Sequence, residues 1–304
     1  MGGLLRKRTS GAHREFSAME RFSSPGKVRN AVRAYQAEGL SVGLVPTMGA
    51  LHEGHLSLIR ASVGECDRTV ISIYVNPTQF APNEDLEDYP RRFEEDCRLA
   101  QENGVDLVFC PADRDMYAEG HATYVVQERL TELLEGDSRP THFRGVLTVV
   151  CKLFNIAPAD RAYFGQKDFQ QTVVVRRMVR DLNLPVTIRV MPTVREPDGL
   201  AMSSRNAYLN REERQQATCL YLALSRAAEL YGCGERDPAP VREAMQEVIQ
   251  DAALARPDYV EIVDHETLEA VEKLSNRAVA VLAVRIGDTR LIDNMPLGSV
   301  DAGD

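Results

Sequence analysis

The most informative part of the sequence for the fold is Val45-Pro46-Thr47-Met48-Gly49-Ala50-Leu51-His52-Glu53-Gly54-His55-Leu56. The segment 41–45 is short and apolar enough to form a buried parallel strand, and the apolar residues after the quoted residues recur at helical spacing. His52 and His55 therefore lie at a strand-to-helix junction. In an open α/β sheet this junction binds ligands, because a helix N-terminus offers unpaired N–H groups and partial positive charge to an anion.

The composition is that of an ordinary globular protein. The chain has 304 residues, long enough for two domains of unequal size, and 44% of them are hydrophobic. Its net charge of −9 gives no general attraction to nucleic acid or to anionic membranes, so an anionic ligand needs a local basic pocket. No stretch approaches the roughly 20 apolar residues of a membrane span. Six scattered cysteines, without a C-x-x-C pair or a secretory segment, predict a reduced, cytoplasmic protein.

Strands and helices alternate along the first two thirds of the chain. We expect strands at 41–45, 69–75, 105–110, 161–164 and 186–191, a short strand at 124–126, and helices at 27–38, 90–103, 146–155 and ending near 182. This alternation predicts an α/β fold with a Rossmann-like, doubly wound parallel sheet. Further on we expect helices starting at 210 and at 240–255, then strands at 259–263, 278–286 and 290–293, which form a second, smaller α+β domain.

The expected domain division has three parts. Residues 1–18 are a disordered extension, with Met19 as a second candidate start of translation. Residues 19–205 form the doubly wound domain, and residues 206–304 form the smaller C-terminal domain.

Residue type and position leave alternatives open at each candidate site. Imidazole N–H groups beside a helix start suit the oxygens of a triphosphate, but two purely structural turn histidines fit the same pattern. Metal binding by His52 and His55 is poorly supported, since no carboxylate or third histidine lies at ligand spacing. Lys167 follows a strand and precedes a helix, yet a bare G-x-K-D is a weak pattern. The segment 203–205 fits either an anion clamp or a polar surface turn.

Five motifs follow one another along the chain. They are Pro46-Thr47-Met48-Gly49-Ala50-Leu51-His52-x-Gly54-His55, Asn76-Pro77-x-Gln79-Phe80, His142-Phe143-x-Gly145-Val146, Phe164-Gly165-x-Lys167-Asp168 and Asp198-Gly199-Leu200-Ala201-x-Ser203-Ser204-Arg205-Asn206. The first is similar to the H-x-G-H signature of nucleotidylyltransferases and class I aminoacyl-tRNA synthetases, which attack ATP or CTP at the α-phosphate. All five together resemble the pantothenate synthetase family over residues 19–295.

The resemblance implies an ATP-dependent ligase. The family condenses (R)-pantoate with β-alanine through an enzyme-bound pantoyl adenylate, and it releases diphosphate and then AMP. Because a carboxylate must attack a polyanion, the site needs positive charge and N–H donors. Carried over to this sequence, the catalytic residues are His52, His55, Lys167, Ser203, Ser204 and Arg205. The ATP site comprises Met48, Gly49, Gly54, His55, Gly165, Lys167, Asp168, Val194, Met202, Ser203, Ser204 and Arg205.

The same resemblance implies a site for pantoate and β-alanine. It consists of Met48, Gln79, Gln171, Arg139 and His142. On a helix only one of Gln170 and Gln171 points inward easily, and the family pattern selects Gln171. Arg139 is expected to pair with the β-alanine carboxylate. The family commonly has glycine where this chain has Thr141, so either that position needs no positive φ or the loop shifts.

Further expectations concern Mg²⁺ and partners. Mg²⁺ bridges ATP phosphates in such reactions, and Asp96 matches the acidic position near that ion. The resemblance also implies a homodimer, with the C-terminal domain acting as a lid. Two other functions stay open: a nucleotidylyltransferase that keeps the nucleotide on its product, and a non-catalytic nucleotide-binding module.

Overall fold

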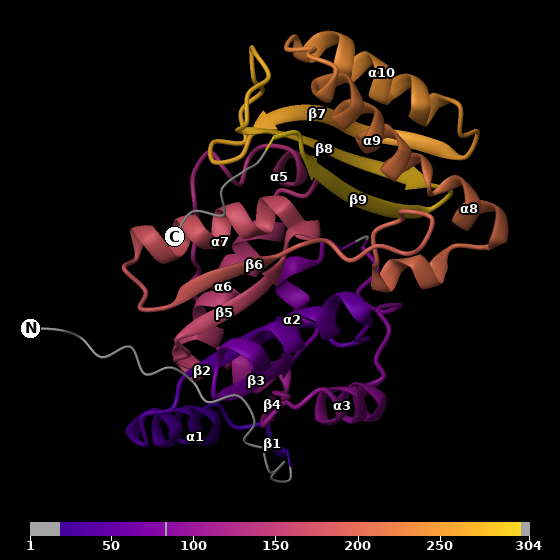
Figure 1. Cartoon of the computed structure of the whole chain (residues 1–304). Helices are drawn as coiled ribbons and strands as arrows, with labels where there is room; N and C mark the ends of the chain where they lie inside the picture. Colours follow the sequence, from indigo (N-terminus) through magenta and orange to yellow (C-terminus); the bar gives the residue numbers. More distant parts are fainter. Residues whose placement is uncertain (1–18, 83, 299–304) are drawn as a thin grey trace, which may run out of the picture.

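The computed structural model describes residues 19–82 and 84–298 (Figure 1). The extension expected at 1–18 lies outside these residues. In Figure 1 a parallel sheet with its helices forms the lower, larger part of the molecule, and a smaller antiparallel sheet lies above it.

The larger sheet has six parallel strands in the order β1-β4-β3-β2-β5-β6. They are β1 (Glu20–Phe22), β2 (Val42–Thr47), β3 (Arg68–Ile73), β4 (Leu107–Phe109), β5 (Arg161–Gly165) and β6 (Thr187–Met191). The chain winds outward in one direction from β2 and in the other from β5, so the topological switch point lies between these two strands. Ligands of doubly wound sheets bind outside the carboxyl ends of the strands at this point. The predicted fold class is confirmed.

Helices cover both faces of this sheet, and alternate residues of each strand point to opposite faces. Leu44 of β2 belongs to the apolar cluster that contains the buried sides of α1 (Pro25–Ala37), α6 (His142–Ile156) and α7 (Phe169–Asp181). Its neighbour Val45 belongs to the other cluster, with α2 (Glu53–Glu65) and α3 (Phe93–Glu102). Short elements connect these: η1 (Pro77–Gln79), α4 (Asp113–Met116), α5 (Glu135–Ser138) and η2 (Gln166–Asp168).

The C-terminal part has its own core. Its sheet consists of the antiparallel strands β7 (Ala255–Asp264), β8 (Ala278–Ile286) and β9 (Thr289–Pro296). The remaining elements are η3 (Ser204–Tyr208), α8 (Arg211–Gln216), α9 (Cys219–Gly232) and α10 (Pro238–Gln250). Leu220, Leu224 and Met245 from the helices pack with Leu282 of β8 in a single buried cluster. The exact boundary at 205 and 206 stays a prediction.

Several element predictions differ from the structure. The segment 124–126 is not a strand, because Val125 N donates to Thr148 Oγ1 on α6 at 3.0 Å and the segment runs over that helix. The strand β1 was not expected, because it has only three residues and Glu20 and Arg21 are exposed.

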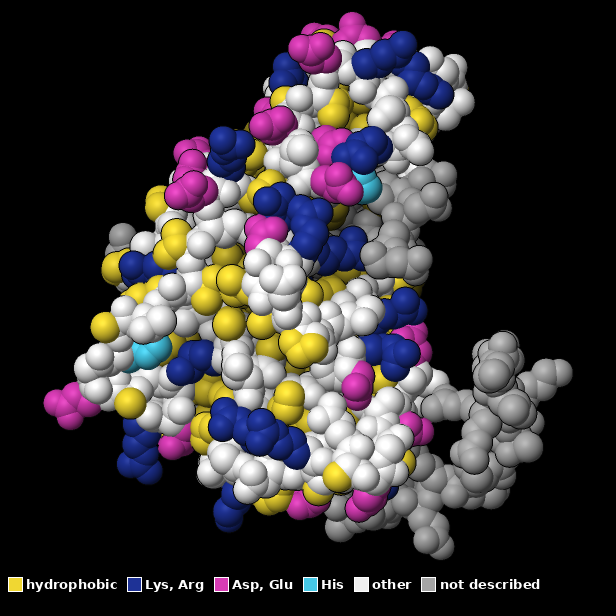
Figure 2. All heavy atoms as spheres, turned by 90° about the vertical axis from the view of Figure 1, so that its left-hand side faces the viewer, with side chains coloured by type: hydrophobic (Ala, Val, Ile, Leu, Met, Phe, Trp, Pro, Cys, Tyr) yellow, Lys and Arg dark blue, Asp and Glu magenta, His cyan; other side chains and the backbone are white. Residues whose placement is uncertain are grey.

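The surface mixes charges of both signs. On the face shown in Figure 2, basic and acidic side chains lie in small separate groups among neutral ones. Within the described ranges, no helix is long and apolar enough to cross a bilayer.

Candidate active site

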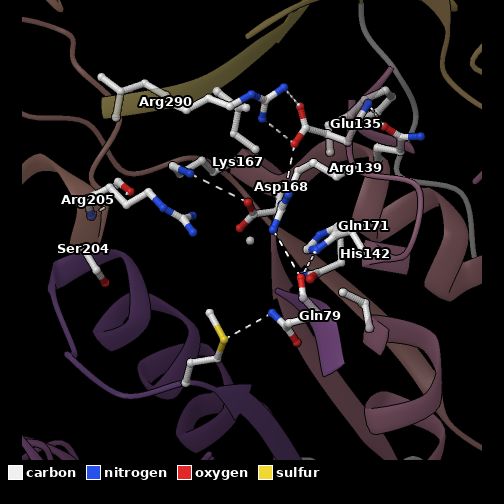
Figure 3. Close-up of a pocket in the computed structure, with 18 of the residues that line it drawn as sticks. Gln79, Glu135, Arg139, His142, Lys167, Asp168, Gln171, Ser204, Arg205 and Arg290 are labelled. Atoms are coloured by element: carbon white, nitrogen blue, oxygen red, sulfur yellow. Dashed lines mark hydrogen bonds and ion pairs between the residues drawn. The ribbon is translucent and has the colours of Figure 1, made fainter. Parts of the chain in front are cut away.

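A cleft of about 1100 Å³ opens between the carboxyl ends of the parallel strands and the C-terminal sheet (Figure 3). Among the predicted site residues, Gly49 and Asp96 do not line it. Those that do are Met48, His52, Gly54, His55, Gln79, Arg139, His142, Gly165, Lys167, Asp168, Gln171, Val194, Met202, Ser203, Ser204 and Arg205. Five sequence motifs that are far apart in the chain therefore meet in one cleft.

The two histidines of the H-x-G-H motif cap the start of α2 reciprocally. His52 Nδ1 accepts from Gly54 N at 3.1 Å, and His55 Nδ1 accepts from His52 N at 3.3 Å. The two ring centroids are 4.1 Å apart. A Cβ at Gly54 would lie 2.8 Å from His52 Cε1, so the glycine lets the ring approach the backbone. The spacing of the motif is thus explained by the cap.

This cap determines the tautomer of both rings. Because each Nδ1 accepts a backbone N–H, a neutral ring must carry its proton on Nε2. Burial lowers the pKa of His52 to about 4, and the positive charge of Lys167 adds to this effect. Burial, followed by His52 and Lys167, lowers the pKa of His55 to about 3. Both side chains are therefore neutral at pH 7 and have Nε2–H groups to donate.

Lys167 lies on the other side of the switch point, in the turn after β5. Its Nζ is 3.7 Å from Asp168 Oδ1. The turn is fixed from the C-terminal sheet, because Asn294 Nδ2 on β9 donates to Gln166 O at 2.8 Å and to Lys167 O at 3.0 Å. The position of the lysine thus depends on contacts between the two sheets.

The segment 203–205 reaches the cleft from the connection to the C-terminal part. Ser203 Oγ accepts from Arg205 N at 3.3 Å, and Ser204 Oγ donates to Ala50 O at 3.3 Å, next to the histidine cap. Arg205 forms a bidentate pair with Asp85, at 2.9 Å from Nε and 2.8 Å from Nη2. The segment is therefore anchored at the cleft and is not a solvated surface turn.

The turn before this segment is held by a second, deeper ion pair. Arg195 donates to both carboxylate oxygens of Asp293 on β9, at 2.6 and 3.0 Å, and the Asp293 side chain is 1% exposed. Val194, just before the turn, lines the cleft, and its carbonyl accepts from Met202 N at 3.0 Å. Its backbone N–H has no hydrogen-bond partner among the described residues, so it can donate to a ligand in the cleft.

Gln79 is positioned by the loop after β3. Asn76, which is 1% exposed, donates from Nδ2 to Gln79 Oε1 at 3.1 Å, and Gln79 Nε2 lies 3.1 Å from Met48 Sδ. Gln171 lines the same cleft as Gln79 (Figure 3), and its side chain has no hydrogen-bond partner among the described residues.

Gln170 has a structural role. Its Oε1 accepts from Glu135 N at 3.0 Å, and its Nε2 donates to Leu130 O and Leu133 O, both at 2.8 Å. Both the oxygen and the nitrogen of this amide bond to the backbone of 130–135. Gln171 is therefore the glutamine left for a ligand.

Arg139 and His142 meet at the carbonyl of Gln79. His142 Nδ1 donates to Gln79 O at 2.9 Å, and Arg139 Nη2 donates to the same oxygen at 3.3 Å. Arg139 also forms a bidentate pair with Glu84, at 2.7 Å from Nε and 2.5 Å from Nη2. Thr141 has φ −98° and ψ −10°, so this position needs no positive φ and threonine replaces glycine without strain.

Asp96, expected beside Mg²⁺, lies instead beneath the turn that precedes α2. Its side chain is buried, and its two oxygens accept from Ala50 N at 2.9 Å and Leu51 N at 2.8 Å. Gly49 belongs to the same turn. Its φ is +85°, and a Cβ there would lie 2.8 Å from Asp96 Oδ2. Both residues shape the turn that presents the histidines, and their assignment to the metal and to ATP stays a prediction.

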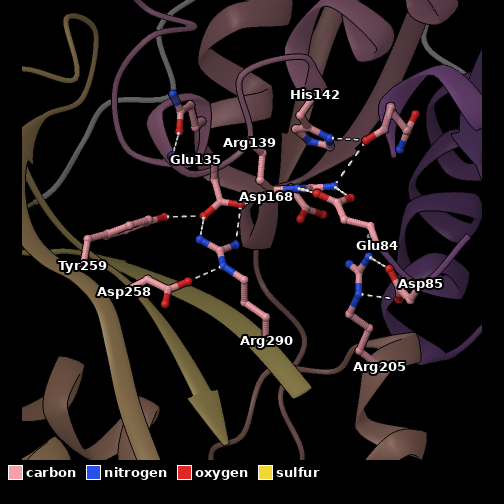
Figure 4. A network of polar contacts seen from close by, with 12 residues as sticks. Glu84, Asp85, Glu135, Arg139, His142, Asp168, Arg205, Asp258, Tyr259 and Arg290 are labelled. Carbon is pink, nitrogen blue, oxygen red and sulfur yellow. Dashed lines mark hydrogen bonds and ion pairs between the residues drawn. The ribbon is translucent and has the colours of Figure 1, made fainter. Parts of the chain in front are cut away.

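Sequence reasoning missed the acidic and basic residues that connect the two parts of the chain (Figure 4). Arg290 on β9 donates to both oxygens of Glu135, at 2.7 and 2.8 Å, and also to Asp258 at 2.6 Å. Tyr259 donates to Glu135 at 2.9 Å, and Arg139 lies 3.8 Å from the same carboxylate. Apart from Arg139 and Glu135, which are four residues apart, the partners are far apart in sequence, so no local pattern indicates them.

Comparisons with known proteins agree with this geometry. The family model described as pantoate-beta-alanine ligase matches residues 20–296. The pantothenate synthetase of Moorella thermoacetica is 56% identical over 279 residues, which are 92% of this chain and 99% of that protein. That of Heliobacterium modesticaldum is 57% identical over 263 residues, which are 86% of this chain and 94% of that protein.

Solved structures give the same result. The pantothenate synthetase of Thermus thermophilus superposes with a TM-score of 0.88 at 46% identity, over 92% of this chain and all of that one (100%). The pantoate-beta-alanine ligase of Francisella tularensis has a TM-score of 0.76 at 33% identity, over 92% of this chain and 98% of that one. The latter was solved in complex with beta-gamma ATP and beta-alanine.

Proposed function

The chain belongs to the pantoate–β-alanine ligase family, and on this basis we propose how its cleft divides the work of the reaction. The enzyme is an ATP-dependent carbon–nitrogen ligase. It condenses (R)-pantoate with β-alanine to give pantothenate, AMP and diphosphate through a pantoyl adenylate. Two bonds are formed in turn, so the cleft must first favour attack on phosphorus and then attack on a carbonyl carbon.

In the first step a pantoate carboxylate oxygen attacks the α-phosphorus of ATP, and the bond to the leaving diphosphate breaks. We assign the Nε2–H groups of His52 and His55 and the ammonium of Lys167 to the phosphate oxygens that gain charge. Donors that are already oriented are effective here, because they need not reorganise during the reaction. The observation that carries this proposal is the reciprocal cap, which leaves both Nε2–H groups available at the switch point.

The rest of the ATP site follows the same cleft. Ser203, Ser204 and Arg205 are proposed to hold the β- and γ-phosphates, since arginine suits bidentate contact with phosphate. Asp168 is proposed to contact the ribose, and the free N–H of Val194 the adenine. The support for these roles is that all five residues line the cleft beside Lys167.

Pantoate is proposed to lie between β2 and α7. Gln79 and Gln171 offer amides to its hydroxyl and carboxylate oxygens, and Met48 covers its apolar side. Polar groups placed for a substrate hydroxyl reject analogues that lack it. Asn76 supports this role indirectly, because it fixes the Gln79 amide by a hydrogen bond of 3.1 Å.

In the second step the β-alanine nitrogen attacks the acyl carbon of the adenylate, and the bond to AMP breaks. Arg139 is proposed to pair with the β-alanine carboxylate. Since His142 donates from Nδ1 to Gln79 O, a neutral ring has a lone pair on Nε2, and this atom is proposed to accept a hydrogen bond from the attacking amine. The proton that the amine loses passes to solvent.

Mg²⁺ is proposed to enter with ATP. Within the described ranges no three His, Cys, Asp or Glu side chains lie together as a metal site, and both oxygens of Asp96 already accept backbone hydrogen bonds. The described side chains are therefore compatible with an ion that would bind mainly through the phosphates of ATP and water. When bound, Mg²⁺ neutralises charge on the leaving diphosphate.

Three broader properties are proposed on the same basis. The protein is a homodimer, as its family resemblance implies, and sedimentation measurements test this. It is cytoplasmic, in agreement with six cysteines that all are free thiols. Residues 206–304 act as a lid over the domain formed by 19–205.

The experiment that tests this function separates the two steps. Labelled diphosphate exchanges into ATP when pantoate is present without β-alanine, and AMP appears only when β-alanine is added. Mass spectrometry of the first mixture detects pantoyl adenylate. Diphosphate release without AMP on addition of β-alanine indicates a nucleotidylyltransferase instead. A chain that binds ATP but supports neither step is a nucleotide-binding module.

A further inference from the structure

The proposed function assigns anionic ligands to two arginines, and each of them already forms an ion pair with one of two adjacent acidic residues. Glu84 fills the guanidinium fork of Arg139, at 2.7 and 2.5 Å. Asp85 fills the fork of Arg205, at 2.9 and 2.8 Å. All four side chains line the cleft (Figure 4). A carboxylate thus already holds each arginine with the geometry expected of a substrate anion.

These pairs are electrostatically strong. Burial acts to raise the pKa of Glu84, but the hydrogen bonds and the charge of Arg139 outweigh it, so the pKa is lowered. The same opposition, with Arg205 as the partner, lowers the pKa of Asp85. Both carboxylates are therefore ionised at neutral pH and compete with any anion for the same N–H groups.

The anchoring of these carboxylates differs from that of other carboxylates paired with arginines in or near the cleft. Asp293, the partner of Arg195, lies on β9, and Glu135, a partner of Arg290, begins α5. Asp258, the other partner of Arg290, is 25% exposed but lies on β7. Glu84 and Asp85 are 21% and 23% exposed. They lie between η1 and α3, where the described residues, 80–82 and 84–92, form neither a helix nor a strand. Releasing them breaks neither a strand nor a helix.

We propose that Glu84 and Asp85 are positioning residues that stand in for the substrate anions: they hold Arg139 and Arg205 in the cleft until the β-alanine carboxylate and the ATP phosphates replace them. The inference rests on the proposed function, which gives those ligands to the two arginines. Without such stand-ins, Arg139 keeps only its contacts with Gln79 O and Glu135, and Arg205 keeps no side-chain hydrogen bond among the described residues, while the two guanidinium groups repel each other across the cleft. With them, each ligand must displace a carboxylate, and this displacement lowers the affinity of the ligand. In return, the arginine is already oriented when the ligand binds.

The test neutralises each carboxylate separately. Glu84→Gln is expected to lower the KM for β-alanine about three- to tenfold, because the ligand no longer displaces a charged partner. Asp85→Asn is expected to lower the Kd for inorganic diphosphate, measured by calorimetry without other substrates, by a similar factor. Glu84→Gln is expected to change the Kd for diphosphate by less than about twofold, and Asp85→Asn is expected to change the KM for β-alanine by less than about twofold.

Glu87→Gln is the matched control, since it removes the same charge from the same segment at an exposed residue that does not line the cleft. It is expected to change neither constant. If Glu84→Gln and Asp85→Asn weaken their ligands while their thermal unfolding matches that of the unaltered chain, the carboxylates support the arginines without competing, and the inference is wrong. The inference is also wrong if Glu87→Gln lowers the KM for β-alanine or the Kd for diphosphate equally, because the change in net charge alone then explains the tighter binding.

A separate variant distinguishes this failure from failure of the proposed function. Arg139→Lys keeps the charge but loses the fork, and it is expected to raise the KM for β-alanine at least tenfold. If it does so while Glu84→Gln gives no gain, the assignment of Arg139 stands and only the stand-in role fails. If Arg139→Lys leaves that KM unchanged, the assignment of the arginine itself is wrong.

Discussion

His52 and His55 lie at the N-terminus of α2, and His142 lies at the N-terminus of α6, so three histidines begin helices beside one cleft. Burial lowers the pKa of each, to about 4, 3 and 4 in turn, which leaves all three neutral at pH 7. Their hydrogen bonds to the backbone differ. In the first pair Nδ1 accepts from an N–H, whereas in His142 it donates to a carbonyl oxygen.

Backbone partners therefore decide what a neutral histidine offers to a ligand. Nε2 is a donor in His52 and His55, which suits phosphate oxygens, and an acceptor in His142, which suits an amine. Both kinds of group are needed, since one step of the reaction stabilises an anion and the other uses a nitrogen nucleophile. Variants at these positions can separate the two roles.

The largest effect is expected from the donor pair. His55→Ala removes one oriented N–H from the α-phosphate and lowers the rate of pantoate-dependent ATP–diphosphate exchange by about 10²–10³. His55→Gln keeps an amide N–H near the position of Nε2 and is expected to recover part of this loss. Equal rates for the two variants contradict the donor role, because they show that an N–H at this position has no value.

The next effect concerns the acceptor. His142→Asn keeps an N–H that donates to Gln79 O but has no lone pair at the position of Nε2. We expect kcat/KM for β-alanine to fall about 100-fold, the lower end of the range for proton-handling groups. ATP–diphosphate exchange is the internal control and changes by less than about threefold. If the rate of exchange falls in parallel, His142 affects both steps of the reaction, and its role does not differ from that of the histidines of α2.

Much of the cleft was predictable because parallel strands are buried on both faces and ligands meet their carboxyl ends. The apolar run at 41–45 and the turn after it therefore indicated both the sheet and its anion site, and the strand is observed at 42–47. The same reasoning placed Lys167 after β5, at the other side of the switch point. The family motifs added Gln171, whose neighbour Gln170 proved to serve the backbone of 130–135.

The partners of the arginines were not predictable, because tertiary packing brings them together. Arg139 pairs with a residue 55 positions away, and Arg290 with one 155 positions away. No periodicity connects such residues. Asp96 shows the same limit: within an acidic run it fits a metal ligand, but the sequence does not show that its position in α3 buries it against the turn at 49–51. A charge in sequence does not reveal which backbone groups it will meet.

A smaller effect is expected at Asp96, whose hydrogen bonds shape the turn that presents His52 and His55. Asp96→Asn places an NH₂ group against one of two backbone N–H groups. We expect a loss of about 2 kcal/mol in the free energy of unfolding, or about 4–8 °C in Tm, together with slower ATP–diphosphate exchange. The KM for β-alanine and the Mg²⁺ concentration at half-maximal rate stay unchanged. A higher Mg²⁺ requirement at unchanged Tm contradicts this structural role and supports a role of Asp96 near the metal.

The smallest effect is expected in the pH dependence of stability. An unfolded histidine titrates near pH 6.5, well above the pKa of about 4 for His142 in the folded protein. Between these values the unfolded chain binds more protons, so the free energy of unfolding falls as pH falls. Each buried histidine contributes on the order of 1–2 kcal/mol to this loss between pH 7 and pH 5. Urea unfolding of the unaltered chain and of His142→Asn at pH 7 and at pH 5 measures how much His142 contributes to this loss in the free energy of unfolding. A variant whose stability falls as steeply as that of the unaltered chain implies that His142 is protonated in the folded protein at pH 5, and its Nε2 is then a donor like those of α2.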